Sequence, residues 1–351
     1  MLKKSLKELF RIIFRIRKFN FYYNRDSRFE KIHSLPVLTK EEINEIKKTW
    51  PNFIFSNKNH IWSKIYKKNK EFSPYFLNDY QYEQLLECTN KSTHVIALQN
   101  KAMLDIWFPM LPWPEVYFRG INKMIFDRDM NVIDISKCVN NLIGKDFFIK
   151  PALETGCGRG VRKIKLTAAN ELKEILSSYL LNGDFIVQSV LQQHELLEKL
   201  NPTSFNTLRI TTILINGKFG YSAAIKIGKE NSFVDNWNSS ILIGIDNDGK
   251  LLSRGYDNNL NIVDKVTGGQ FAGISIPSFT EIISLVEKYH KYYFPVAGII
   301  GWDIGIDTLG NPILVEINLD YPGILGEQLV SGDFFKSFVG EINNYMKINK
   351  K

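Results

Sequence analysis

Three side chains near the C-terminal end of the sequence have types and a spacing that suit a metal ion. Glu316 and Asn318 are two residues apart in the apolar run ILVEIN, so they project from one face of a strand. Asp303, in GWDIGID, would lie across from them if the chain folds back at the intervening TLGN. Oxygen donors without His or Cys suit Mg²⁺, which completes its octahedron with water and phosphate oxygens. The sequence therefore predicts a magnesium site.

The residues around these three side chains predict that the site is buried. Ile304, Ile306, Leu314, Val315 and Ile317 are apolar, so both faces of the hairpin should be covered. Unpaired buried carboxylates are costly, and a cation would remove that cost. The alternative is an exposed sheet face with three solvated polar residues.

Asp320 follows Asn318 at the same two-residue spacing, so it is expected on the same face. Residues 321–323, YPG, follow directly and are expected to form a rim. Asp320 is therefore a candidate substrate contact.

A second group of residues has the features of a phosphate site. Lys150 stands alone among apolar residues in FFIKP, and the loop TGCGRG follows within a few residues. Glycines let backbone N–H groups turn toward a phosphate, and Arg159, Arg162 and Lys163 add positive charge. TGCGRG matches neither of the common nucleotide-loop patterns, and Lys150 on a sheet edge is the alternative. A lysine strand, a glycine loop and a carboxylate hairpin together suit a nucleoside triphosphate with Mg²⁺. The loop glycines are Gly156, Gly158 and Gly160.

The elements that would position these groups are mixed. Thr39 and Glu42 form a capping-box pattern for a short helix that Pro51 ends, and Ser278 with Glu281 repeats the pattern. Thr167 is expected to cap another helix, just after which Gly183 lies. The second half of the chain is rich in strand patterns and hairpin turns, which predicts an α+β fold without a dinucleotide βαβ unit.

Composition bounds the functional classes. The chain has 351 residues, a net charge of +8 and three cysteines without a CxxC pair, which is typical of a reduced compartment. Residues 1–31 hold ten Lys and Arg against three acids at an amphipathic helical spacing. This segment is expected either to contact an anionic membrane surface or to pack on its own protein. Nucleic acid is not an expected partner, because no motif of a known reader is present.

In order along the chain, FIKP, the glycine loop, FIVQSVLQQHE, NTLRITT, GWDIGID and LVEIN resemble the ATP-grasp superfamily, and most closely its sugar-transfer-associated group. The resemblance covers roughly residues 93–345 and implies two α+β subdomains that grip ATP, with a hinge near 185–195. Residues 1–92 would form a helical, basic N-terminal region and residues 346–351 a tail.

The resemblance also implies roles for individual residues. Lys150 and Lys101 would bind ATP phosphates, and the loop glycines would form a lid over them. Arg209 would act with Lys150 as a catalytic group by steadying the transferred phosphate, while the three predicted oxygen ligands would hold Mg²⁺. The adenine edge would meet Gln188, Ser189 and Val190, and the ribose would meet Glu195 or His194.

This chain departs from the group at the acceptor side. Lys226 stands where the group commonly has arginine, and Ser239–Ser240 replace a glycine pair after the retained Asn236. Lys226 and Asn236 are candidate substrate contacts.

The implied activity is an ATP-dependent carboxylate–amine ligase that acts on a sugar or a sugar-linked precursor of a cell-surface polysaccharide such as a capsule. It would work in the cytoplasm or at the inner face of the membrane. The alternatives are a phosphotransferase with the same fold and a non-catalytic membrane-surface or partner-binding protein.

Overall fold

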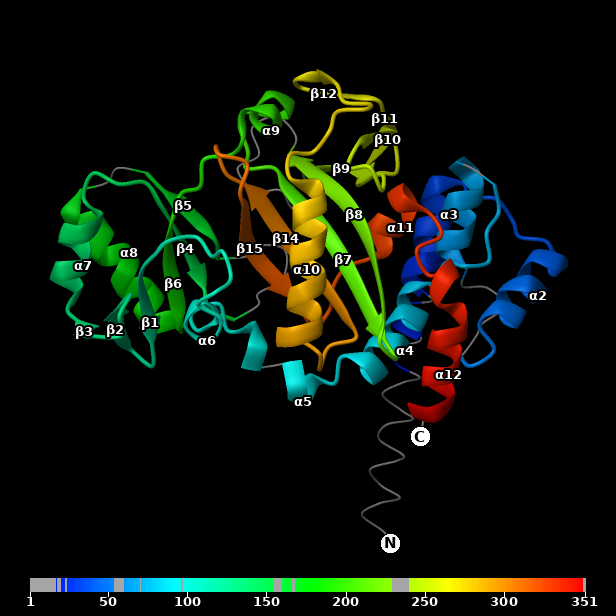
Figure 1. Ribbon diagram of the computed structural model, residues 1–351, viewed down its shortest axis with the longest axis horizontal. Coiled ribbons are helices and arrows are strands. Elements are labelled where there is room, and N and C mark those ends of the chain that lie inside the picture. Colours follow the sequence, from blue (N-terminus) through cyan, green and yellow to red (C-terminus); the bar gives the residue numbers. More distant parts are fainter. Residues whose placement is uncertain are drawn as a thin grey trace, which may run out of the picture.

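A computed structural model describes residues 17, 20–22, 24–53, 60–69, 71–95, 97–153, 160–165, 168–228 and 240–349 (Figure 1). Two separate antiparallel sheets dominate it. The smaller sheet has six strands in the order β3-β2-β1-β6-β4-β5, and the larger has seven in the order β11-β10-β9-β8-β7-β14-β15. Figure 1 shows β15, the edge strand of the larger sheet, on the side that is turned toward the smaller sheet. The α+β class predicted from the sequence is confirmed.

The strand bounds are as follows. The smaller sheet contains β1 (Val116–Ile121), β2 (Met124–Asp127), β3 (Val132–Ile133), β4 (Phe147–Pro151), β5 (Arg162–Ile164) and β6 (Phe185–Ser189). The larger contains β7 (Thr207–Ile215), β8 (Lys218–Gly228), β9 (Ser240–Ile245), β10 (Leu251–Asp257), β11 (Ile262–Val263), β14 (Ile299–Ile306) and β15 (Pro312–Asn318). A separate two-stranded sheet contains β12 (Lys265–Val266) and β13 (Gly269–Gln270).

Helices cover one face of the smaller sheet. The helices are α7 (Ile135–Leu142) and α8 (Ala169–Asn182), and Leu172 and Leu176 pack against Phe147 and Phe185 in one buried cluster. The opposite face carries Ile186 in a cluster with Ala102 and Ala152. Lys150 pairs with Ile186 in the β4–β6 register, so it belongs to this second face, which α7 and α8 do not cover.

The larger sheet is covered on both faces, and its residues alternate between the two covers. Leu208 and Trp302 pack in a core with α10 (Phe279–Tyr293). Ile213 and Ile299, which have the opposite parity, pack with the N-terminal helices. Arg209 and Asp303 share this second parity, so they project from the face that the N-terminal helices cover.

The cover of that face combines the two ends of the chain, as Figure 1 shows. We call residues 40–90, as far as they are described, the N-terminal layer. It contains α2 (Lys40–Thr49), α3 (Ile61–Asn69) and α4 (Asp79–Thr89). The C-terminal part of the cover is α11 (Leu325–Ser331), the 3-10 turn η3 (Lys336–Phe338) and α12 (Val339–Asn349). Short elements connect the layers: α5 (Ser92–Val95), the 3-10 turn η1 (Ala97–Gln99), α6 (Leu104–Trp107) and α9 (Glu195–Leu200).

The helix ends test three predictions. The Thr39 capping box is confirmed, because the Glu42 N–H donates to Thr39 Oγ1 at 3.2 Å and the Thr39 N–H donates to Glu42 Oε2 at 2.7 Å. The prediction for Ser278 was wrong: this residue has a left-handed φ of 53°, and its hydroxyl donates to the Gly310 carbonyl instead. Ala168, not Thr167, precedes α8, without a side-chain cap, and Thr167 lies outside the described residues.

The basic segment 1–31 is described only at residue 17 and from residue 20 on, apart from residue 23, and those residues are helical. No helix in the described part of the chain is long and apolar enough to cross a membrane. The boundary expected at residue 92 stays a prediction, although the N-terminal layer shares its core with the larger sheet.

Candidate functional site

Five polar side chains from four neighbouring strands meet on the covered face of the larger sheet. Asp303 of β14 lies opposite Arg209 of β7 and Glu316 of β15 in the strand registers. The Asp303 carboxylate accepts hydrogen bonds from Arg209 Nε at 2.7 Å and Arg209 Nη2 at 2.9 Å, which is a bidentate pair. It also accepts from Lys226 Nζ at 2.8 Å and from Asn318 Nδ2 at 3.1 Å.

Burial and charge act in opposite directions on this cluster. Burial alone would raise the pKa of Asp303, but Arg209 and Lys226 outweigh it and hold the pKa well below its usual range. Burial likewise opposes the charge of Arg209, yet Asp303 and Glu327 keep its pKa above the ordinary value. Asp303 and Arg209 are therefore both charged at neutral pH, and they form a preorganised pair of charges.

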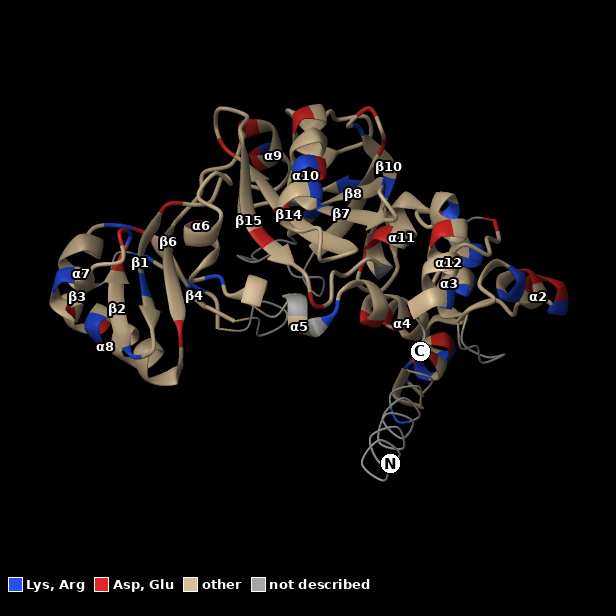
Figure 2. Cartoon of the chain, turned by 60° about the horizontal axis from the view of Figure 1, so that its bottom comes forward, with Lys and Arg blue, Asp and Glu red and all other residues tan. Residues whose placement is uncertain are grey.

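Glu316 has its own cationic partner. Its Oε1 lies 3.0 Å from Lys101 Nζ, and both side chains are partly exposed. Lys101 is also tied to the end of β4, because its backbone N–H donates to the Ala152 carbonyl at 2.7 Å. The pair therefore joins the smaller sheet to the edge strand of the larger one, where Figure 2 shows the acidic band of β15.

These contacts correct one premise of the magnesium prediction. The sequence led us to expect unpaired carboxylates whose burial only a cation could balance. In the structure Asp303 is paired with Arg209 and Lys226, and Glu316 with Lys101. The case for a cation therefore rests on the donor chemistry and not on an uncompensated charge.

The donor chemistry fits Mg²⁺. Asp303, Glu316 and Asn318 converge as predicted and offer two carboxylates and an amide oxygen, which are hard ligands that cover part of an octahedron. Among the described residues, no group of three or more His, Cys, Asp or Glu side chains is arranged to hold a metal ion. A cation at this position would therefore depend on Asn318 and on oxygen atoms from a nucleotide.

Glu327 completes the cluster, and the sequence did not predict it. It lies in the first turn of α11, is 4% exposed, and its Oε1 is 3.7 Å from Arg209 Nη1. Burial raises its pKa, and Arg209 opposes that shift. In the sequence Glu327 lies in PGILGEQ, shortly after a Pro-Gly turn. Acidic residues are common at the start of exposed helices, so no local signal distinguishes Glu327 as a buried residue.

The predicted phosphate side is described in part. Lys150 lies on β4 as predicted, with its Nζ 5.8 Å from the centre of the Phe148 ring. Gly160 has a φ of +79°, and a Cβ there would lie 2.7 Å from Pro151 Cγ, so this position requires glycine. Gly156, Gly158 and Arg159 lie outside the described residues. Lys101 and Lys150 are both near the end of β4 on the side that α7 and α8 leave uncovered.

The predicted hinge runs from β6 into the larger sheet. Gln188 is buried within β6, and the Ser189 N–H donates to the Glu115 carbonyl at 2.9 Å. Val190 is half-buried and directly follows the strand. The chain then reaches the larger sheet, where the His194 N–H donates to the Ile306 carbonyl at 2.9 Å.

The two candidates for the ribose differ in their surroundings. His194 is the N-cap of α9, because its Nδ1 accepts from the Leu196 N–H at 3.2 Å. Glu195 is exposed, and its carboxylate pairs with Lys199 at 3.2 Å, four residues on. An exposed pair of this kind contributes little to stability, so Glu195 can exchange its partner easily.

The three predicted substrate contacts differ in where the structure places them and in whether it describes them. Lys226 belongs to the Asp303 cluster. Asn236 lies outside the described residues. For Asp320 the expected strand alternation fails, because β15 ends at Asn318 and Asp320 lies exposed in the bend that follows.

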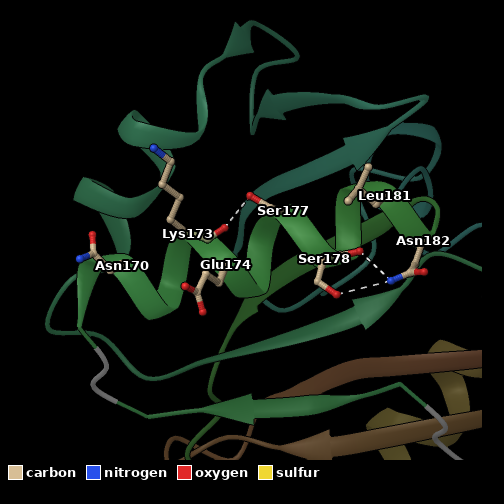
Figure 3. Close-up of a pocket in the computed structure, with 7 residues that line it drawn as sticks. All are labelled: Asn170, Lys173, Glu174, Ser177, Ser178, Leu181 and Asn182. Carbon is tan, nitrogen blue, oxygen red and sulfur yellow. Dashed lines mark hydrogen bonds between the residues drawn. The ribbon is translucent and has the colours of Figure 1, made fainter.

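A surface hollow lies on α8, away from these residues. Its lining comes from one helix, and Figure 3 shows side chains that hydrogen bond back along that helix, such as Ser177 Oγ to the Lys173 carbonyl at 2.7 Å. It is therefore a feature of the helix surface and not a built site. The lining residues are Asn170, Lys173, Glu174, Ser177, Ser178, Leu181 and Asn182.

Comparisons with known proteins point to one family. Residues 80–344 match the sequence model of the family described as sugar-transfer associated ATP-grasp. No curated protein matches the chain.

Several solved structures are similar at low identity. D-alanyl-alanine synthetase A from Vibrio cholerae is 12% identical with a TM-score of 0.43, and the match covers 72% of this chain and 65% of that one. The ATP-grasp ligase PsnB, solved with a minimal precursor, is 14% identical with a TM-score of 0.41, over 75% of this chain and 63% of that one. N5-carboxyaminoimidazole synthetase from Staphylococcus aureus is 12% identical with a TM-score of 0.36, over 63% of this chain and 44% of that one. The chain spans less than two thirds of the length of these structures.

Proposed function

The chain belongs to the sugar-transfer-associated ATP-grasp family, and we propose that it is an ATP- and Mg²⁺-dependent ligase that joins a carboxylate to an amine. One observation carries this proposal. Asp303, Asn318 and Glu316 converge with Arg209 and Lys226 on one sheet face, next to Lys101, whose backbone is bonded to Ala152 at the end of β4. Two hard carboxylates beside several fixed cations suit a triphosphate and its metal.

The proposed roles follow the surroundings of each residue. Asp303, Glu316 and Asn318 would hold Mg²⁺, which when bound neutralises charge on the phosphates. Lys101 and Lys150 would contact the phosphates beneath a lid that includes Gly156, Gly158 and Gly160. Gln188, Ser189 and Val190 would meet the adenine. Glu195 is favoured over His194 for the ribose, because His194 Nδ1 already caps α9.

The proposed reaction has two steps. In the first, a substrate carboxylate oxygen attacks the terminal phosphorus of ATP, the bond to the bridging oxygen breaks, and ADP leaves. In the second, an amine attacks the acyl-phosphate carbon, inorganic phosphate leaves, and the amine loses a proton. Arg209 and Lys150 would stabilise the negative charge on the transferred group, since fixed cations in a partly buried site need no reorganisation. Lys226, Asn236 and Asp320 are the residues we assign to the acceptor side.

We further propose that the acid and the amine belong to a sugar or a sugar-linked precursor of a cell-surface polysaccharide such as a capsule. The name of the family supports this proposal. The protein would then act in the cytoplasm or at the inner face of the membrane, with residues 1–31 contacting anionic lipid. Their charge, ten Lys and Arg against three acids, supports that contact. Binding to vesicles should rise with anionic lipid and fall with salt, and equal binding to neutral vesicles would contradict it.

Nucleotide binding is tested by thermal unfolding. ATP with Mg²⁺ at about 100 times the dissociation constant should add about 2.7 kcal/mol to the free energy of unfolding. The double variant Asp303→Asn with Glu316→Gln should lose most of this gain. No gain in the wild type, or an equal gain in the double variant, would remove the catalytic proposal.

The chemistry is tested by mass spectrometry. Sustained ADP formation should require both an acid and an amine, and the product should be a new amide. Phosphate on a stable hydroxyl ester would instead identify a phosphotransferase.

A further inference from the structure

The chain segment after β15 reaches back to Arg209. Asp303 holds this side chain through Nε and Nη2. The remaining terminal nitrogen, Nη1, lies 3.5 Å from the Gly323 carbonyl and 3.7 Å from Glu327 Oε1. Arg209 is therefore held by two carboxylates, Asp303 on its own sheet and Glu327 on a helix that covers the sheet.

The two carboxylates differ in what else they bind. Asp303 accepts from Lys226 and Asn318 as well as from Arg209, so its oxygens are shared among three donors. Glu327 has Arg209 as its ion-pair partner and is nearly fully buried. A buried carboxylate is costly unless it is paired, so its contact with Arg209 stabilises one arrangement of the guanidinium group.

The N-terminal layer anchors the segment that carries Gly323 and Glu327. The Leu77 backbone exchanges two hydrogen bonds with the Gln328 side chain, at 3.0 and 3.1 Å, directly beside Glu327. The Tyr82 hydroxyl donates to the Pro322 carbonyl at 2.5 Å, next to Gly323.

Two further contacts fix the ends of the same segment. Asn90 Nδ2 donates to the Leu319 carbonyl at 2.8 Å, and Ser73 Oγ lies 2.6 Å from Asp333 Oδ1. The family match begins at residue 80, so Ser73 and Leu77 lie before it.

We propose that Glu327 is a positioning residue for Arg209, and that the N-terminal layer holds Glu327 in place through Leu77 and Tyr82. This inference rests on the proposed function, in which Arg209 faces the transferred phosphate. Glu327 keeps the guanidinium plane oriented while Asp303 also accepts hydrogen bonds from Lys226 and Asn318. Leu77, which lies before the family match, thus acts on Arg209 through its contact with the α11 segment.

The test compares affinities for two nucleotides. Calorimetry measures the dissociation constants of the non-hydrolysable ATP analogue AMPPNP and of ADP, each with Mg²⁺. Arg209→Ala should reduce the preference for AMPPNP over ADP, because only AMPPNP carries the terminal phosphate. Glu327→Gln should reduce the same preference by roughly threefold to tenfold, a range expected for residues in one ion-pair network. Gln328→Met, which removes both bonds to Leu77, should act in the same direction with a smaller change.

Two comparisons separate positioning from a merely structural role. In the double variant Arg209→Ala with Glu327→Gln, the preference should equal that of Arg209→Ala alone, because Glu327 acts through Arg209. The matched control Glu341→Gln removes an exposed pair with Lys218 and should leave the preference unchanged.

Two outcomes would overturn the inference: a Glu327→Gln protein that is less stable but keeps the wild-type preference, or additive effects in the double variant. If Glu327→Gln fails to fold, the Gln328→Met protein and its combination with Arg209→Ala decide the question. A wild type that binds neither nucleotide would refute the proposed function itself, which is a different result.

Discussion

Asp303 is the side chain on which the cluster depends most. It is 6% exposed and accepts from three side chains, two of them cationic. Because both cations are themselves largely buried, removal of its charge would leave them without their main counter-charge.

We therefore expect Asp303→Asn to lower the free energy of unfolding by about 3 kcal/mol, the order found when one partner of a buried pair is lost. Urea denaturation measures this change. Glu341→Gln, at an exposed pair with Lys218, is the matched control and should change the value by well under 1 kcal/mol. Equal stability of Asp303→Asn and the wild type would mean that the pair makes no net contribution.

The sequence predicted part of the residue-scale site. Glu316 and Asn318 are two residues apart on one strand, and Asp303 faces them across a tight hairpin, so periodicity and turn chemistry were sufficient to bring the three together. Lys226 lies on the β7–β8 hairpin and Glu327 on a helix, and only the packing of those elements brings Lys226 to Asp303 and Glu327 to Arg209. Their burial leaves no local pattern in the sequence, and the ion pairs that balance the carboxylates were missed for the same reason.

At the scale of elements, helix ends also show that local contacts can be predicted from the sequence and tertiary contacts cannot. The Thr39 box was predictable because its two hydrogen bonds are local, within three residues. Ser278 has the same spacing to Glu281, but its hydroxyl is held by Gly310, 32 residues away in the sequence, and its backbone is left-handed. A tertiary contact therefore overrides the capping preference, and no local pattern could have indicated it.

A chain of hydrogen bonds attaches α10 to the larger sheet. Trp302 Nε1 donates to Thr212 Oγ1 at 2.8 Å, and Thr212 Oγ1 lies 2.7 Å from His290 Nδ1. His290 Nε2 lies 2.7 Å from the Ala297 carbonyl, which can only accept, so Nε2 carries the proton and Nδ1 accepts from the hydroxyl. Burial lowers the pKa of His290 well below neutral pH, so the imidazole is neutral at pH 7 in the folded protein.

This arrangement predicts a loss of stability in acid. Burial lowers the pKa of His290 to about 4, so the unfolded chain, with a pKa near 6.5, binds the proton more strongly. The contribution of His290 to the free energy of unfolding is complete above about pH 6.5. It is lost as the pH falls toward 4, and the loss amounts to at most about 3 kcal/mol. Urea denaturation of the wild type and of His290→Gln at pH 7 and pH 4.5 measures this loss of stability.

The variant should show a smaller difference between the two pH values than the wild type. Burial also lowers the pKa of His60 to about 4, so His60 adds to the pH dependence of stability in the wild type. His60→Gln is the comparison variant. If the free energy of unfolding changed equally between the two pH values in the wild type and in His290→Gln, a neutral buried His290 would be contradicted.

For the whole molecule, the contact that matters most to the proposed function is the pair between Lys101 and Glu316, because it joins the two sheets. Lys101 is fixed to the end of β4 through its backbone, and its Nζ lies 3.0 Å from Glu316 Oε1 on β15. The lysine proposed for the phosphates and a carboxylate proposed for the metal thus face each other across the junction between the sheets.

Lys101→Met should therefore separate stability from nucleotide binding. Both partners are partly exposed, at 19% and 28%, so the pair itself should contribute no more than about 1 kcal/mol to the free energy of unfolding. The affinity for ATP should fall by more than about tenfold, because the proposed phosphate contact beside the end of β4 is lost, a change of at least about 1.4 kcal/mol. Urea denaturation and calorimetry with ATP measure the two quantities on the same protein. Lys291→Met, which removes an exposed pair with Glu287 on α10, is the control. If Lys101→Met weakens the fold more than it weakens ATP binding, the lysine serves to hold the sheets together and not to bind phosphate.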